Sequence, residues 1–458
     1  MKNMGRLLDV IDRSTSGPVC DEKEFELKYV ADGVARVVEK YGIQFDKSRI
    51  IQVDDDMNDR VWQAAIDFLE QCGVYNTDTG RRITFSRREI EEAIKWAPDR
   101  ATIGTGADVR EVVYREIGDP RPPIILSGPI GVPLREDLYV TITQSYMQEP
   151  VIDSMAPGCL ETCLGREVRS KSPMEVIACW REIDLMFTAL RQAGRPGMPV
   201  GVLVTSSGDA GYLSGIGRGG YRPTDRHTIA LVGEMKTNNE LLNKVVHSVR
   251  QDGFIHGFYN PILGGLGGGE EGLSVLITAG MIGVTLIYMA VTQATCPTHP
   301  FLFNDTAPQI LRTVSVSTAA ISRNSPLLSV VMTSPVGGPG TETLLYECVA
   351  MATTATVCGA ANLLGVRSAV GVIPNHCSGL EGRFNGEIGH AAAGLTREEA
   401  NGIVEKAVAQ YEPVMDTKPV GKPFWEVYDP LTIQPTDEWL AIYDKVKAQS
   451  ASWGLRYK

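Results

Sequence analysis

The chain has 458 residues, of which 43% are hydrophobic and 22% charged, the ordinary composition of a globular protein. Its formal net charge of −11 argues against nucleic acid and anionic membranes as partners. The nine cysteines are scattered without a short paired framework, and charged residues interrupt the first apolar stretch, so we expect a cytoplasmic protein without a secretory signal. The apolar run at residues 284–291 has only the length of a strand, so we expect no membrane span.

Residues 1–123 are predicted to form a helical N-terminal extension. Apolar residues recur at helical spacing within residues 24–41 and 57–72. Ser86 and Glu89 have the spacing of a capping box, which predicts a helix over residues 87–96. This extension is expected to supply packing and interface surface rather than chemistry.

From residue 124 onward, short apolar runs alternate with helical stretches. Strands are predicted at residues 124–127, 151–155, 198–204, 254–260, 284–291, 301–304, 327–334 and 368–374. Helices are predicted between them at residues 173–192, 228–251, 271–282, 307–323 and 342–364. This alternation predicts an α/β fold, a (β/α)8 TIM barrel over residues 124–395, with a C-terminal helical segment at 396–458 packed on it. An open doubly wound sheet is the alternative.

Two glycine-rich loops follow predicted strands. Residues 205–225 contain six glycines with little apolar periodicity, and residues 264–269 contain five. Loops longer than about 15 residues are uncommon in compact domains and are usually functional. Because the active site of a TIM barrel lies where its strands end, we expect both loops to rim the mouth of the barrel without sealing it.

One predicted strand carries the first candidate catalytic residue. Side chains alternate along a strand, so His256, Phe258 and Asn260 share one face, with Asn260 nearest the strand end. If that face is the barrel interior, His256 can donate a proton or bind a metal, although a core histidine is the alternative. Asn260 and Tyr259 are neighbouring candidates. Glu342 is either a general acid or a favourable charge at a helix start.

Motifs along nearly the whole chain resemble those of the monomethylamine:corrinoid methyltransferases. The resemblance implies the family's barrel fold, a homo-oligomeric state, and transfer of a methyl group from a small donor to the Co(I) of a separate corrinoid protein. The motifs are Cys72-Gly73-Val74-Tyr75, Thr77-Asp78-Thr79, Gly104-Thr105-Gly106, Lys171-Ser172-Pro173, Gly194-Arg195-Pro196-Gly197-Met198, Gly338-Pro339 with Thr341-Glu342, and Gly421-Lys422-Pro423-Phe424 with Tyr428-Asp429.

The chain departs from the family at the position of its special residue. The resemblance implies that pyrrolysine, whose electrophilic imine captures the amine, belongs where this chain has Gly201. Two family glutamates correspond to Thr228 and Phe258, and a family glutamine corresponds to Met332. These four positions are therefore expected to line one substrate pocket, which should be roomier and more apolar than that of the family.

Such a pocket suits a flat neutral ring better than a cationic methylamine. We therefore expect the substrate-specific methyltransferase of an O-demethylase system, acting on a methoxylated aromatic and a cognate corrinoid protein. The poor leaving group of such a donor needs an acid or a metal to stabilise it. Zinc is a candidate metal, although the sequence does not identify its ligands. A non-catalytic assembly protein is the alternative outside the class. Within the class of corrinoid-dependent methyltransferases, the alternative is a methylamine or quaternary-amine methyltransferase. Its aromatic cage would be built from Tyr212, Tyr221, Phe258 and Tyr259.

Overall fold

The computed structural model describes residues 4–201, 205, 208–217 and 219–457. Seven parallel strands pair in the order β6-β5-β14-β13-β12-β11-β9. Their bounds are β5 (Ile124–Ser127), β6 (Ser154–Met155), β9 (Arg226–Leu231), β11 (Phe254–Tyr259), β12 (Thr292–Thr295), β13 (Leu328–Thr333) and β14 (Asn362–Gly365).

The segment at residues 200–201 closes this sheet into a barrel. Met155 of β6 forms a parallel bridge with Val200, and Gly201 forms one with Arg226 of β9. Following the residue pairs once around the barrel from Ala230 leads back to the same strand at Arg222, eight residues earlier. A shear of eight over eight strand positions is the geometry of a TIM barrel, which confirms the predicted fold class.

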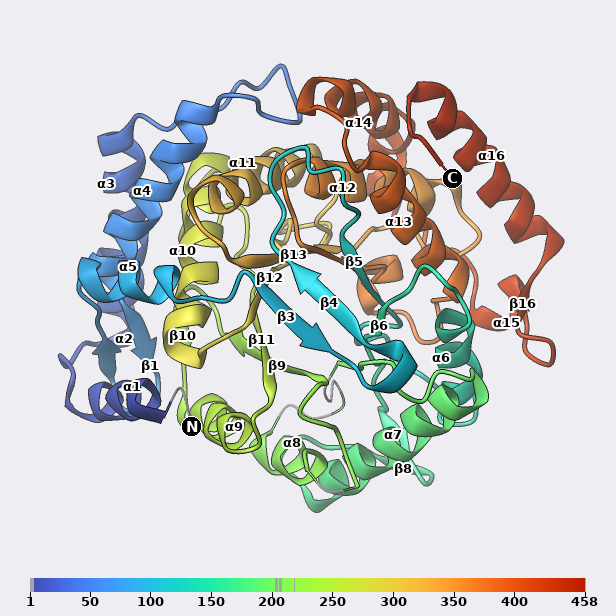
Figure 1. Ribbon diagram of the computed structural model, residues 1–458, viewed down its shortest axis with the longest axis horizontal. Helices are drawn as coiled ribbons and strands as arrows, with labels where there is room; N and C mark the ends of the chain where they lie inside the picture. Colours follow the sequence, from blue (N-terminus) through green and yellow to red (C-terminus); the bar gives the residue numbers. More distant parts are fainter. Residues whose placement is uncertain (1–3, 202–204, 206–207, 218, 458) are drawn as a thin grey trace.

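Helices surround the strands on the outside, as the ring in Figure 1 shows. They are α6 (Tyr139–Met147), α7 (Pro173–Gln192), α8 (Asp209–Gly215), α9 (Asn239–Arg250), α10 (Glu270–Tyr288), α11 (Pro308–Asn324), α12 (Glu342–Val357) and α13 (Gly379–Ala392). The predicted helix at residues 173–192 coincides with α7, whose first residue is a proline that has no N–H to leave unpaired.

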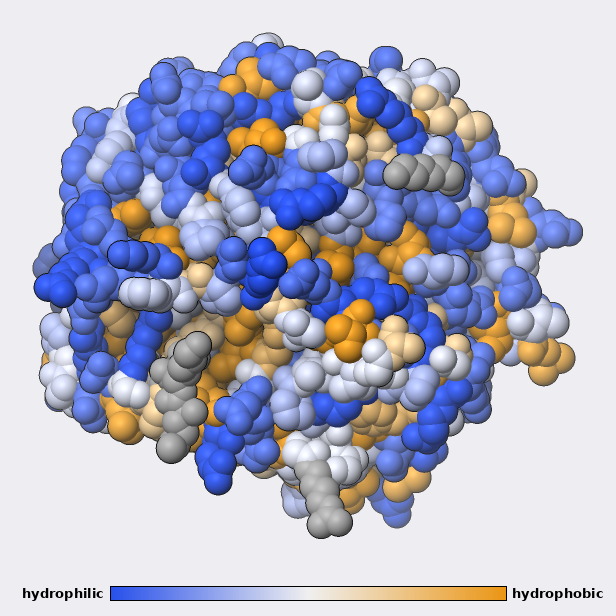
Figure 2. Space-filling view, in the orientation of Figure 1, coloured by the Kyte–Doolittle hydropathy of each residue, from blue (hydrophilic) through white to orange (hydrophobic). Residues whose placement is uncertain are grey.

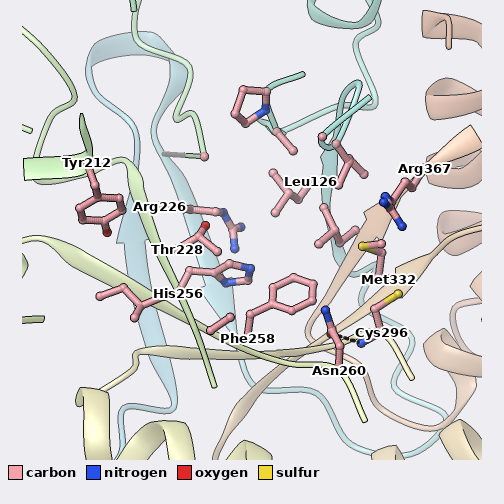
Figure 3. A pocket seen from close by; sticks show the side chains of 18 of the residues that line it. Leu126, Tyr212, Arg226, Thr228, His256, Phe258, Asn260, Cys296, Met332 and Arg367 are labelled. Carbon is pink, nitrogen blue, oxygen red and sulfur yellow. Dashed lines mark hydrogen bonds between the residues drawn. The ribbon is translucent and has the colours of Figure 1, made fainter. Parts of the chain in front are cut away.

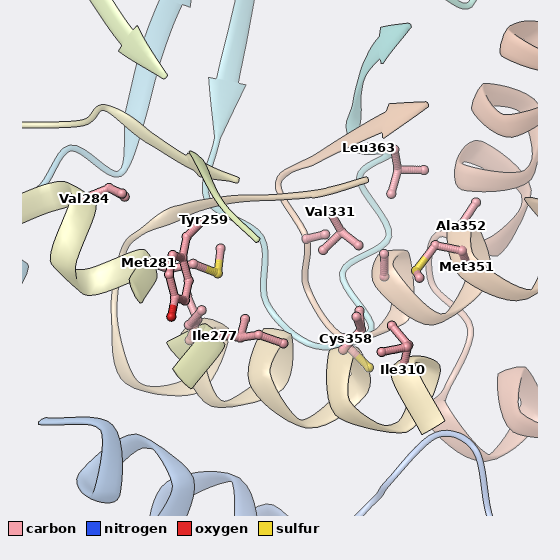
Figure 4. Packing of buried hydrophobic residues seen from close by; sticks show 14 of the residues in the cluster. Tyr259, Ile277, Met281, Val284, Ile310, Val331, Met351, Ala352, Cys358 and Leu363 are labelled. Carbon is pink, nitrogen blue, oxygen red and sulfur yellow. The ribbon is translucent and has the colours of Figure 1, made fainter. Parts of the chain in front are cut away.

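Helix α10 lies at the centre of the core between the barrel and the N-terminal helices. Figure 4 shows Ile277, Met281 and Val284 of this helix packed with Tyr259 of the neighbouring strand. By length and composition α10 is apolar enough to cross a membrane, a feature that the sequence analysis missed. However, 94% of that apolar window is buried inside the protein, as expected for a core helix.

The N-terminal extension contains strands as well as helices, so the prediction that it is helical is only partly right. Short strands bounded by turns carry too few residues for an alternating pattern to stand out. Its elements are α1 (Met4–Ser16), α2 (Glu22–Glu24), η1 (Phe25–Ala31), α3 (Asp32–Tyr41), α4 (Asp55–Cys72), β1 (Val74–Asn76), β2 (Arg81–Ile83), α5 (Arg87–Lys95), β3 (Arg100–Ile103), η2 (Gly106–Asp108) and β4 (Arg110–Val113). The capping box of Ser86 and Glu89 is present at the start of α5, as predicted.

The hairpin of β3 and β4 closes the end of the barrel at which its strands begin. Ile103 and Val112 of the hairpin form an apolar cluster with Phe254, Leu328 and Ala361, which lie at or next to strand starts. Figure 1 shows the hairpin crossing the middle of the ring, and Figure 2 shows that this face is largely hydrophilic. A cavity inside the barrel must therefore open at the opposite end.

The C-terminal segment is mainly helical. Helix α16 packs against α12 of the barrel and against α14 of the same segment. The elements of this segment are α14 (Arg397–Tyr411), η4 (Glu412–Thr417), α15 (Phe424–Val427), β15 (Tyr428–Asp429), β16 (Gln434–Pro435) and α16 (Asp437–Trp453). Four short elements lie in the connections between the barrel strands and helices: β7 (Thr162–Cys163), β8 (Arg166–Glu167), β10 (Lys236–Thr237) and η3 (Ser368–Gly371).

Three predicted strands are wrong, and three real ones were missed. Residues 284–291 mostly belong to α10, whose continuous burial removes the helical period from its sequence. Residues 301–304 form a turn in which Phe301 is 77% exposed, and residues 368–374 contain the short helix η3. Strands β9 and β14 overlap segments predicted as helix, and β12 follows the segment assigned as strand. Of the strand predicted at 198–204, residues 202–204 lie outside the described residues.

Candidate functional site

A cavity of about 520 Å³ occupies the barrel interior above the hairpin. Apolar and small side chains form most of its wall, as Figure 3 shows. The described lining residues are Leu126, Ile130, Gly131, Ala156, Pro157, Gly201, Tyr212, Arg226, Thr228, Ile229, Ala230, Leu241, Lys244, His256, Phe258, Asn260, Cys296, Thr298, Met332, Leu364 and Arg367.

A layer of polar side chains forms the floor of this cavity. In a barrel with this shear, alternate strands contribute four side chains to each interior layer. The register places Ser154, Arg226, Thr292 and Asn362 in one such layer. Arg226 Nη2 donates a hydrogen bond of 2.8 Å to Asn362 Oδ1 across the barrel. Because barrel interiors are usually filled by bulky branched residues, this layer is unusual.

His256 lies one layer above the floor and is held in a defined orientation. Its Nδ1 lies 2.8 Å from Thr292 Oγ1, while its Nε2 is buried without a hydrogen-bond partner among the described residues. The ring meets that of Phe258 edge to face at 5.8 Å. Burial, with a smaller contribution from the Arg226 charge, lowers the pKa of His256 well below its usual value. The neutral imidazole is therefore favoured at physiological pH, and the role of His256 as a proton donor or metal ligand stays a prediction.

The structure brings together the four residues predicted to line the substrate pocket. Gly201, Thr228, Phe258 and Met332 all line the same cavity. A Cβ atom at Gly201 would lie 3.2 Å from Pro157 Cδ, a tight contact, so a side chain at this position would require Pro157 to shift.

Of the three other predicted catalytic residues, one lines the cavity and two lie elsewhere. Asn260 lines the cavity and is exposed, and its Oδ1 accepts a hydrogen bond from the Cys296 backbone N–H (Figure 3). Tyr259 alternates to the other face of β11, where its buried ring packs against Gly280 of α10. Glu342 is the first residue of α12 and pairs with Lys445 outside the cavity, which supports the alternative of a charge at a helix start.

The aromatic residues considered for a cage are also divided. Tyr212 and Phe258 line the cavity, but Tyr221 and Tyr259 do not. Lys244 Nζ already lies 5.1 Å from the centre of the Tyr212 ring. Phe258 is therefore the aromatic ring that remains available to a bound cation.

The residues in the described part of the chain do not fit a zinc ion. No group of three or more His, Cys, Asp or Glu side chains there is arranged to hold a metal. Cys296, which lines the cavity, donates from its Sγ to Asp305 Oδ2 at 3.5 Å, and burial raises its pKa well above the usual value. A thiolate ligand is therefore disfavoured.

Asp305 itself belongs to the wall behind the cavity. Its Oδ1 accepts a hydrogen bond of 2.7 Å from the Ser334 backbone N–H, and burial raises its pKa to about 8. The folded protein thus retains a proton that the unfolded chain releases near the ordinary pKa of 3.8. Stability contributed by this protonated state is present at acidic pH and is lost as the pH rises toward 8.

Replacing Asp305 by asparagine is expected to remove this component of the pH dependence. The change should flatten the decline in unfolding free energy between pH 5 and pH 8 by up to about 1.4 kcal/mol per pH unit. Urea unfolding at several pH values measures it, with Asp184→Asn on the exposed surface of α7 as the control. A parallel decline in Asp305→Asn and the wild type would show that Asp305 is ionised in the folded protein.

The two glycine-rich loops differ in their relation to the cavity. Tyr212 lines the cavity from α8, within the predicted loop 205–225, of which residues 206–207 and 218 lie outside the described residues. No residue of 264–269 lines it. This second loop instead leads into α10, where Gly272 lies close to Val34 of the N-terminal extension. Its place at the rim of the mouth stays a prediction. A Cβ atom at Gly267 would lie 2.5 Å from Leu276 Cδ1 of α10, so this glycine permits close packing.

Sequence reasoning missed the cationic side chains of the site. Arg226, Lys244 and Arg367 line the cavity, and no aspartate or glutamate is among its described lining residues. Arg226 was missed because it lies between the predicted loop 205–225 and the predicted helix 228–251, so no strand was predicted there. The Arg-His-Thr start of β9 carried an alternating pattern that would have placed Arg226 and Thr228 on one side.

A closed barrel with a deep cavity at the carboxyl ends of its strands defines the class of TIM-barrel enzymes. The pattern of the family described as "Monomethylamine methyltransferase MtmB" matches residues 6–455. Over 447 residues the chain is 34% identical to monomethylamine methyltransferase MtmB2 of Methanosarcina acetivorans and 33% identical to that of Methanosarcina barkeri; each alignment covers 98% of this chain and 97% of the relative.

Solved structures agree with the sequence relatives. The crystal structure of the Methanosarcina barkeri monomethylamine methyltransferase and that of a hydroxylamine complex of MtmB each superpose with a TM-score of 0.96 at 32% identity, covering 98% of both chains. The chain therefore belongs to the monomethylamine methyltransferase family, and it is a methyltransferase. The expectation of a methoxylated aromatic donor is wrong, because the relatives are named for a methylamine.

Proposed function

We propose that this protein transfers a methyl group from a methylated amine to the Co(I) of a separate corrinoid protein. The observation that carries the proposal is the family match along almost the whole chain, together with the cavity at the carboxyl ends of the barrel strands. The corrinoid protein supplies the nucleophile. The bond between methyl carbon and nitrogen breaks, the new bond forms to cobalt, and the bonding electron pair stays on the nitrogen.

The cavity residues support an ammonium donor in two ways. The buried Nε2 of the neutral His256 can accept a hydrogen bond from an amine N–H. The ring of Phe258 beside it can stabilise the positive charge, an interaction worth about 2 kcal/mol when desolvated. When the donor nitrogen carries a positive charge, the group that leaves after methyl transfer is a neutral amine, so no additional acid is needed.

Gly201 gives this chain a different way of holding its donor. We infer that it leaves open the space that the family resemblance assigns to pyrrolysine, so the donor is bound by non-covalent contacts. Gly201, Thr228, Phe258 and Met332 then shape the wall around the amine. The nine cysteines all lie in the described part of the chain and form no disulfide, which supports a reducing cytoplasm as the setting.

A donor panel tests this proposal. The purified protein is combined with Co(I) corrinoid protein and with methylated amines that differ in methylation and in other substituents. Transfer from at least one amine, detected as the spectral change from Co(I) to methyl-Co(III), is the expected result, and an aryl methyl ether serves as the control donor. Transfer from the ether alone, or from no amine, would overturn the proposal.

A further inference from the structure

Arg226 is a buried cation without a counter-charge in direct contact. Its side chain is 0% exposed, and its one hydrogen bond in the described structure goes to the neutral amide of Asn362. The guanidinium Nε and Nη1 and the Asn362 Nδ2 are buried donors without partners there. The nearby carboxylate of Asp153 is committed to Arg110 at 2.7 Å and to the Ile125 N–H. Burying a charge in this way is costly unless a partner satisfies it.

The rest of the cavity adds positive charge instead of balancing it. The half-buried Arg367 lines the opposite side, beside Met332 and Leu126 in Figure 3, and its guanidinium has no hydrogen bond or ion pair within the described residues. With no carboxylate among the described lining residues, this environment leaves the charge of an ammonium donor without an ionic partner and attracts an anionic group.

We propose that the methyl donor carries a carboxylate in addition to its methylated amine, and that Arg226 binds this carboxylate. The substrate class is that of N-methylated amino acids. This inference rests on the proposed function, since it names the donor of the same reaction. A carboxylate accepts charge-assisted hydrogen bonds, so it can satisfy the free N–H groups of Arg226 and Asn362 together.

The order of the layers along the barrel fits the two ends of such a donor. Arg226 lies in the floor, His256 lies one layer higher, and Phe258 lies two residues further along β11 toward the exposed Asn260. The strand rise is about 3.3 Å per residue, comparable with the distance from a carboxylate to the amine of an α-amino acid. With its carboxylate on the floor, the amine reaches His256 and the N-methyl group faces the open end.

Matched donors test the inference by binding and by transfer. Isothermal titration calorimetry compares N-methylglycine with dimethylamine, which lacks only the carboxylate, and with acetate, which lacks the amine. We expect the wild type to bind N-methylglycine at least about tenfold more tightly than either fragment, which corresponds to 1.4 kcal/mol. Arg226→Met should abolish the advantage of N-methylglycine, whereas Arg88→Met on the exposed face of α5 should retain it.

Two further comparisons keep the outcome decisive. If Arg226→Met does not fold, Arg367→Met, at the other side of the cavity, should reduce the tighter binding of N-methylglycine. The wild-type comparison of N-methylglycine with dimethylamine tests the inference without any variant. Equal binding of N-methylglycine and dimethylamine, or an advantage that persists in Arg226→Met, overturns the inference. Transfer from plain methylamines without any gain from the carboxylate overturns it as well while leaving the proposed function standing. Absence of transfer from every amine, with or without a carboxylate, overturns the proposed function.

Discussion

Replacing His256 by alanine is expected to lower the rate of methyl transfer from an amine donor by roughly 10–150-fold, because a hydrogen bond to a charged group is worth about 1.5–3 kcal/mol. The variant loses the buried Nε2, which lies at the cavity and has no partner among the described residues. Because the pKa of His256 lies well below its usual value, the wild-type rate should show no inflection from this residue between pH 6.5 and pH 8. Single-turnover methylation of Co(I) at several pH values measures both effects.

His227 offers a matched control on the neighbouring strand. It is equally buried, but its Nδ1 lies 3.2 Å from Ser248 Oγ and its Nε2 lies 3.0 Å from the Arg222 carbonyl oxygen, away from the cavity. His227→Gln should cost stability and retain the transfer rate. Added imidazole should partly restore His256→Ala, since the cavity has room for it. A folded His256→Ala protein with the wild-type rate would assign His256 to the core alone.

Replacing Arg115 by methionine is expected to lower the free energy of unfolding by about 3–5 kcal/mol. Its buried guanidinium donates four hydrogen bonds of 2.7–2.9 Å to backbone carbonyl oxygens, and burial lowers its pKa to about 10. The acceptors are Thr356, Ala360, Asp119 and Arg121, so one side chain ties the connection after β4 to the end of α12 and the approach to β14. Methionine fills similar space but leaves these carbonyl groups unpaired.

Urea denaturation monitored by circular dichroism measures this loss. Arg88→Met is the control, because Arg88 forms an exposed i,i+4 pair with Glu92 that is worth only about 0.3–0.5 kcal/mol. A change of less than about 0.5 kcal/mol in Arg115→Met would mean that the carbonyl groups find other donors. The transfer rate of the folded fraction should remain that of the wild type, because Arg115 lies outside the cavity.

The sequence predicts the fold class and one face of the site, because both follow from local pattern. Alternation along β11 places His256, Phe258 and Asn260 on one side, and all three line the cavity. The family motifs bring Gly201 and Met332 to the same cavity from distant parts of the chain.

The remaining errors come from features that no short window of sequence contains. Helix α10 is buried on every side, so its apolar residues show no helical period and part of it was assigned to a strand. Strands β9 and β14 adjoin helices without a strong break, so they were absorbed into them. The polar floor depends on strand register around the whole barrel, which only the closed structure fixes. This is why the layer that Arg226 forms with Asn362 was not predicted.

The apolar seal between the β3–β4 hairpin and the strand starts has a kinetic consequence. With that end closed, donor, departing amine and corrinoid must share the opening at the other end. A macrocycle positioned over this opening blocks diffusion of the small molecule beneath it. Under the proposed function, binding is therefore compulsory-ordered, with the donor first and the corrinoid protein second, and excess corrinoid protein inhibits turnover by occupying the empty barrel.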